Sequence, residues 1–152
     1  MKKSFTYVLA IFAVAFMICG ASTACTPCAE PLTKGYWSNH PEHISNIIGD
    51  GIWLGGGFGP KSIHVTSTDQ AVALLKIDDA SNGIDKLYAQ ELATKLNIFN
   101  GADASGMWDI LWEIDCFLTH HNSADWNSLN EEQKQMVINW ALILDNYNNN
   151  LN

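Results

Sequence analysis

Two amphipathic segments near the middle of the chain restrict its fold more than any other feature. Between residues 84 and 98, apolar side chains recur at steps of three and four, which places them on one face of an α-helix. Residues 105–119 carry a similar stripe, with Trp108, Trp112 and Cys116 forming a second stripe beside it. The sequence therefore predicts two long helices. The second is apolar around most of its circumference, so we expect it to be the central helix.

Weaker signals on both sides of these helices complete a mainly helical fold. A serine or threonine can cap a helix over about residues 69–76, and a capping box formed by Ser128 and Glu131 precedes a last helix. Two β-prone runs, residues 52–54 and 62–65, flank a glycine-rich loop. The predicted fold class is mainly α: a small domain of about four helices with one short β-hairpin.

The N-terminus has the three-part layout of a secretory signal. Two lysines after Met1 are followed by an apolar run over residues 7–20 and by small residues at 21–24. This run is shorter than the stretch of about 20 residues that spans a membrane. We therefore predict a signal peptide over residues 1–24 and a single exported helical domain over residues 25–152, secreted or held in the cell envelope.

The charge of the exported part disfavours nucleic acid as a partner. Without Lys2 and Lys3, six lysines and no arginine face 16 acidic residues, for a formal charge of −10. Binding to phosphate backbones needs clustered basic side chains, which six scattered lysines cannot provide.

The exported part has an odd number of cysteines, so either one thiol stays free, two chains share a bridge, or Cys25 is modified. Cys19 lies inside the signal, so Cys25, Cys28 and Cys116 would reach an oxidising compartment. A disulfide from Cys28 (or Cys25) to Cys116 uses two of these three thiols. We expect this disulfide whether or not Cys25 carries the lipid of a bacterial lipoprotein, and such an anchor is the one membrane contact that we expect.

The segment just after the signal, residues 33–43, is dense in aromatic and imidazole groups. Tyr36 and Trp37 carry a large apolar surface that a flexible leader would leave exposed. We expect both rings to pack against the helices and so to attach residues 33–43, which we call the clip, to the domain. The role of His40 stays open.

Four segments resemble a family of secreted and cell-surface bacterial proteins with no established activity. They are Lys34-Gly35-Tyr36-Trp37-Ser38-Asn39-His40-Pro41, residues 63–75, the run from Leu92 to Ala102 that contains Lys95-Leu96-Asn97 and Asn100-Gly101-Ala102, and residues 144–149. Family members often carry lysine where this chain has Ser38. The resemblance implies an exported, largely helical domain, and it supplies no mechanism.

The leading functional hypothesis is a binding or structural module whose ligand, a protein or a surface ligand, is unknown. Trp53 and Phe58 lie on the glycine-rich hairpin, where exposed aromatic rings make good contact residues. His40 is the third candidate for binding. No cofactor is expected in this hypothesis.

Two alternatives use the histidines. In the first, His40 and His43 hold a divalent metal together with nearby histidines or carboxylates. A zinc site that adds Cys25 and Cys28 has both intervals one residue short of a zinc finger. In the second, a hydrolase uses His40 as a base with Glu113, whose place on an apolar helix would raise its pKa if it were buried.

Overall fold

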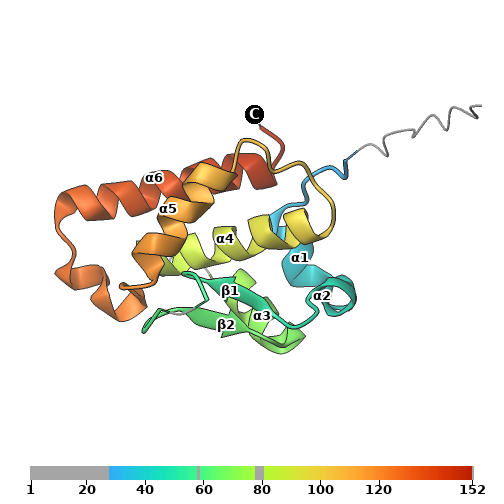
Figure 1. Cartoon of the computed structure of the whole chain (residues 1–152), viewed down its shortest axis with the longest axis horizontal. Coiled ribbons are helices and arrows are strands. Elements are labelled where there is room, and N and C mark those ends of the chain that lie inside the picture. The colour runs from blue at the N-terminus through green and yellow to red at the C-terminus, as the bar shows by residue number, and fades with distance from the viewer. Residues whose placement is uncertain (1–27, 58, 78–80, 152) are drawn as a thin grey trace, which may run out of the picture.

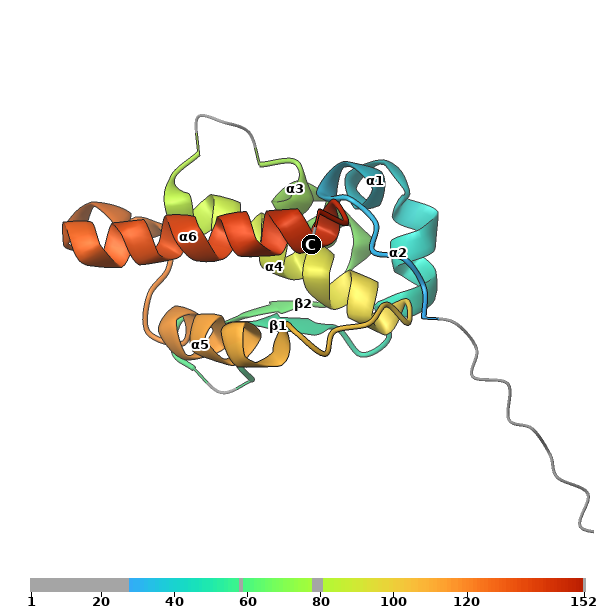
Figure 2. The ribbon, with the colours of Figure 1, turned by 90° about the horizontal axis from the view of Figure 1, so that it is seen from above.

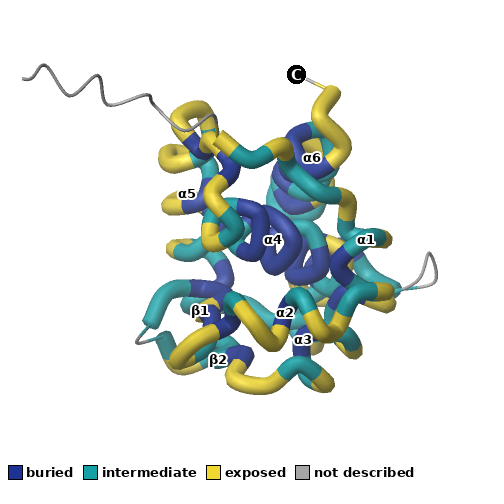
Figure 3. The backbone as a smooth tube through the Cα atoms, turned by 90° about the vertical axis from the view of Figure 1, so that its right-hand side faces the viewer, coloured by how far each residue is buried: buried dark blue, intermediate teal, exposed yellow. Residues whose placement is uncertain are grey.

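Helix α4 (Gly83–Phe99) runs through the middle of the molecule, and the other elements surround it (Figure 3). The computed structural model describes residues 28–57, 59–77 and 81–151. Buried side chains occur on every side of α4, including the polar residues Glu91, Thr94 and Asn97. The fold is thus organised around one buried helix.

The described elements follow one another as a mainly helical chain with one hairpin, which confirms the predicted fold class (Figure 1). In order they are α1 (Lys34–Asn39), α2 (Pro41–Ile47), β1 (Ile52–Leu54), β2 (Ile63–Val65), α3 (Thr68–Leu75), α4, α5 (Trp108–Leu118), the 3-10 helix η1 (Ser123–Ser128) and α6 (Glu131–Asn148).

The predicted number of about four helices is too low, since the described residues form seven helical elements. The additional ones, α1, α2 and η1, span six or seven residues each, too few to show a hydrophobic period. These short helices depend instead on capping interactions at their first residues. Thr33 accepts a hydrogen bond from the amide of Tyr36 to begin α1, and Pro41 occupies the first turn of α2, where its missing N–H costs nothing.

Helix α5 is not the central helix that its apolar sequence predicts. One side of α5, with Leu111, Ile114 and Leu118, packs into the core. The stripe with Trp108 and Trp112 faces outward, where these side chains are 58% and 69% exposed. Figure 2 shows α5 on the outside of the molecule, beside the hairpin.

The hairpin pairs β1 with β2 in antiparallel register, with Trp53 opposite His64. It is anchored to α5, because Asp115 accepts hydrogen bonds from the amides of Gly55 and Gly56, each at 2.9 Å. Gly55 has φ of +82°, and a Cβ there would collide with the backbone of Leu118. The glycines at this turn therefore allow the hairpin to approach α5 closely.

The start of α6 differs in detail from the prediction. Its capping box is formed by Asn130 and Gln133, two residues after the predicted pair of Ser128 and Glu131. Ser128 instead closes the end of η1 by donating to the carbonyl of Asp125. In the part of the chain that the structure describes, no helix has the length and apolar character needed to cross a membrane.

Candidate functional site

The N-terminal segment is bound to the core through Trp37, as the sequence predicts. The Trp37 side chain is fully buried, and its indole N–H donates to Asn97 Oδ1 at 2.9 Å. Asn97 also accepts from the amide of Leu32 and donates to the carbonyl of Leu32 and to Asn148 Oδ1. Three of the segments that carry the family resemblance thus meet in one hydrogen-bond network. The role of this network is to hold the fold together.

His40 and His43 are part of the same clip and do not converge on a metal site. The ring of His43 lies between the Tyr36 hydroxyl, at 3.1 Å from Nδ1, and Asn100 Oδ1, at 3.0 Å from Nε2. His40 stacks on the ring of Tyr36 and donates from Nδ1 to its carbonyl at 2.8 Å. Among the described residues, no group of three or more histidine, cysteine or acidic side chains is placed to hold a metal.

The structure does not bring His40 and Glu113 together as a catalytic pair. His40 lies between α1 and α2, whereas Glu113 is on the exposed side of α5. The Glu113 side chain is exposed, so it lacks the burial that the hydrolase hypothesis requires.

Cys28 and Cys116 are free, exposed thiols in this structure and do not form the predicted disulfide. Cys28 is next to Ala29, which bridges to Ala102 beyond the end of α4. Cys116 is two turns into α5, about 12 Å along the helix from Trp108. Cys25, the predicted lipidation site, and residues 1–24, the predicted signal peptide, lie outside the described residues.

Of the predicted contact residues, Trp53 is 39% exposed on β1 and Phe58 lies outside the described residues. The indole of Trp53 stacks on the His64 imidazole, with ring centroids 4.2 Å apart and planes within 2° of parallel. This stacking covers one face of Trp53 and fixes its orientation. The other predicted binding residue, His40, belongs to the clip.

Trp53 forms one edge of a surface groove of about 490 Å³, which we call the aromatic groove. The C-terminal part of α4, the start of β1 and the N-terminal half of α5 enclose it. Its floor contains the buried side chains of Ile52 and Leu111. Its other lining residues are Gly51, Trp53, Lys95, Ile98, Phe99, Trp108, Trp112 and Asp115.

The rings at the edge of the aromatic groove are the large exposed aromatic side chains of the described chain: Trp53, Phe99, Trp108 and Trp112. None of the three indole N–H groups at this groove donates a hydrogen bond within the described residues, in contrast to the buried indole of Trp37. The exposed rings at the aromatic groove therefore present apolar faces, and their three indole N–H groups have no hydrogen-bond partner in the described part of the chain.

A charged cluster at one end of the groove has a structural role. The Lys95 ammonium donates to the carbonyl of Trp53 at 2.7 Å, to Glu91 Oε1 at 2.6 Å and to Asp115 Oδ1 at 2.8 Å. These contacts join α4, β1 and α5. Because a lysine has three donors, the partners of Lys95 are already complete.

The pKa values of the two carboxyl groups in this cluster, Glu91 and Asp115, are shifted in opposite directions. Complete burial raises the pKa of Glu91 to about 8, to which the nearby Asp115 charge adds, although Lys95 opposes it. Burial also acts to raise the pKa of Asp115, but the Lys95 ammonium and hydrogen bonds outweigh it and lower this pKa. Glu91 Oε2 has no hydrogen-bond partner among the described residues. Glu91 is thus easier to protonate than an exposed glutamate, whereas Asp115 keeps its charge beside Lys95.

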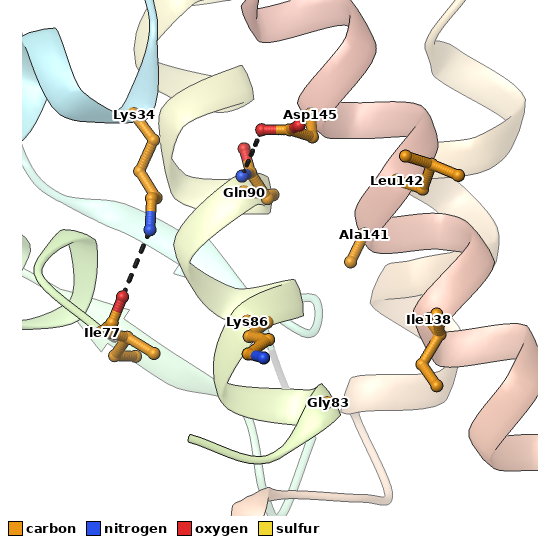
Figure 4. Close-up of a pocket in the computed structure, with 9 residues that line it drawn as sticks. All are labelled: Lys34, Ile77, Gly83, Lys86, Gln90, Ile138, Ala141, Leu142 and Asp145. Carbon is orange, nitrogen blue, oxygen red and sulfur yellow. Dashed lines mark hydrogen bonds between the residues drawn. The ribbon is translucent and has the colours of Figure 1, made fainter. Parts of the chain in front are cut away.

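A second pocket of about 380 Å³ lies between α4 and α6 (Figure 4). Its polar side chains are engaged in internal bonds: Lys34 donates to the carbonyl of Ile77 at 3.2 Å, and Gln90 donates to Asp145 at 2.7 Å. Ile138 and Leu142 provide its exposed apolar wall. This pocket lacks the aromatic side chains of the aromatic groove.

Comparisons with known proteins identify no relative: no family model, no curated protein and no solved structure matches this chain.

Sequence reasoning missed Phe99, Trp108 and Trp112 as surface residues. All three continue the helical stripes, and such positions are usually buried. One feature of the sequence could have indicated that these side chains are exposed. A helix with two adjacent stripes needs partners on both, and the chain offers few further apolar elements to cover the stripe that contains Trp108 and Trp112.

Proposed function

We propose that this protein is an exported binding module that takes its ligand in the aromatic groove. The observation that carries the proposal is the meeting of Trp53, Trp108 and Trp112 around one hollow with unused indole N–H groups. Exposed tryptophans on a rigid scaffold combine a large contact area with a small loss of side-chain entropy on binding.

The rigidity of the groove supports this function. Trp53 is held by its stack on His64, and Trp108 and Trp112 project from successive turns of one helix. The Lys95 cluster connects the three walls. A ligand would therefore bind a largely preformed surface, and few groups would have to be ordered on binding.

The export part of the proposal rests on the layout of residues 1–24 and on the resemblance to exported proteins. Mass spectrometry of the protein purified from its host tests it. A mature chain that begins at Cys25 is expected, and a diacylglyceryl adduct on Cys25 would make the protein a lipoprotein. An intact residue 1–24 segment in the cytoplasmic fraction would contradict export.

Nuclear magnetic resonance of the indole N–H groups tests binding at the groove. Six tryptophans give six indole signals, which single substitutions assign. Mixtures of short peptides, oligosaccharides and detergent-solubilised lipids are added in turn to the purified protein. We expect at least one mixture to shift the signals of Trp53, Trp108 and Trp112.

The signal of Trp37 is the internal control, because this indole is buried and bonded to Asn97. Ligand-induced shifts at the groove should exceed those at Trp37. If every mixture leaves the three groove signals as unmoved as that of Trp37, the aromatic groove is not a binding site and the proposed function is wrong.

A further inference from the structure

We propose that the ligand of the aromatic groove is an extended, proline-rich peptide segment that carries basic residues. This inference rests on the proposed function and adds the class of ligand. Three features of the groove lead to it: its hydrogen-bonding groups, the spacing of its rings and the charge around it.

The unused polar groups of the groove are donors. The indole N–H groups of Trp53, Trp108 and Trp112 have no partner in the described part of the chain, and Asp115 already accepts from two backbone amides and from Lys95. A ligand buried here should offer acceptors and few donors, because an unpaired buried donor costs about 1–3 kcal/mol. Proline supplies a carbonyl acceptor and has no N–H.

The ring spacing also suits such a peptide. Trp108 and Trp112 are four residues apart on α5, which separates them by about 6 Å along the helix axis. In a polyproline II helix two residues span about 6.2 Å, and two of every three residues can rest on one surface. Successive contacting prolines can therefore meet Trp108 and Trp112, as in other aromatic grooves that bind proline-rich segments.

The charge around the groove favours a basic ligand. Asp109 is exposed on α5 next to Trp108, and Asp50 is exposed next to Gly51, which lines the groove. Lys95 is the one basic residue that lines the groove, and it is paired with Asp115 and Glu91. Lysine or arginine residues flanking the prolines would meet this acidic rim, and their contribution would weaken with salt.

Fluorescence titration with synthetic peptides tests the proposal. The first peptide has about eight prolines, long enough to cover the groove, with two lysines at each end. Two matched peptides replace all prolines by glycine or all lysines by glutamate. We expect saturable binding of the first peptide, at least tenfold weaker binding of the glycine peptide, and weaker binding of the glutamate peptide.

Variants locate the binding. Trp108→Ala and Trp112→Ala should each weaken binding of the first peptide at least tenfold, whereas Trp112→Phe, which keeps a ring but loses the N–H, should show an intermediate loss. Leu142→Ala is the matched control, because Leu142 is an exposed apolar residue outside the groove. Circular dichroism melting establishes that each variant is folded.

An oligosaccharide of N-acetylglucosamine is titrated in parallel. If it binds in a manner that depends on Trp112 and the proline peptide does not, the ligand class is wrong although the groove still binds. Equal binding of the proline and glycine peptides would also overturn the proposal. Indole signals that no ligand class shifts would instead contradict the proposed function itself.

Discussion

At the scale of single residues, Asn97 shows how one buried amide holds distant segments together. Both its carbonyl oxygen and its amide nitrogen have two partners, which come from the N-terminal segment and from the end of α6. A fully bonded buried amide is stabilising, but its partners lose their bonds when it is removed.

We therefore expect Asn97→Ala to lower the free energy of unfolding by about 3 kcal/mol, because Trp37 Nε1 and the Leu32 backbone would lose their partner. Urea denaturation measures this loss. The matched control is Asn139→Ala at an exposed position of α6, which should change stability by less than about 0.5 kcal/mol. Equal effects of both substitutions would show that the network contributes little.

Glu91 makes stability depend on pH. Its pKa is raised to about 8 in the folded protein, above its ordinary value of 4.5, so the folded state holds a proton that the unfolded state has lost between these values. The Glu91 contribution to stability is thus fully present below the ordinary pKa and is lost as the pH rises to about 8.

For the wild type, we expect the free energy of unfolding to fall between about pH 5 and pH 8, with a slope from Glu91 of up to about 1.4 kcal/mol per pH unit. Glu91→Gln, which carries no titrating proton, should remove this part of the slope. Urea denaturation across this range provides the measurement. A slope that is identical in the two proteins would mean that the pKa of Glu91 is not raised.

At the scale of elements, the ends of helices depend on single polar side chains. The start of α6 is the clearest case, because Asn130 and Gln133 each accept a hydrogen bond from the backbone amide of the other. Ser128, which the sequence suggests as the cap, bonds within η1.

Asn130→Ala should therefore reduce the free energy of unfolding by about 1 kcal/mol, as is usual for the loss of an N-cap. Ser128→Ala tests the alternative cap and should cost clearly less. Thermal denaturation of both variants discriminates the two starts of the helix. A larger loss for Ser128→Ala would support the capping box that the sequence predicts.

The contact between η1 and the N-terminus of α4 requires a glycine. A Cβ at Gly83 would overlap the ring of Trp126, so Gly83→Ala forces one of these elements to move. We expect a loss of about 1–3 kcal/mol, although alanine normally favours a helix. Gly106→Ala is the control, because nothing lies within 4 Å of a Cβ there. Stabilisation by Gly83→Ala would show that Trp126 can move without cost.

At the scale of the whole molecule, the reactivity of the two described cysteines tests whether a disulfide constrains the chain. Cys28 and Cys116 are exposed and unpaired, so both should react with a maleimide in the native protein without reductant. Peptide mapping by mass spectrometry identifies the labelled residues. Cys28 and Cys116 that react only after reduction would restore the predicted disulfide and require their segments to meet.

Much of the secondary structure could be predicted because its causes are local. The spacing of apolar residues predicts α4 and α5, Ser67 caps α3 as expected, and the two β-prone runs form the hairpin. The burial of Trp37 follows from the same argument, since a large ring beside helical stripes is expected to cover them.

The sequence by itself determined the helical class, the hairpin and the clip, because periodicity, capping and turn residues act within a few positions of the chain. Only the tertiary structure decided that α4 is buried on all sides, that Trp108 and Trp112 are left outside, and that Glu91 loses contact with water. These properties depend on which of several apolar faces meet, and a face looks the same in the sequence whether it finds a partner or remains open.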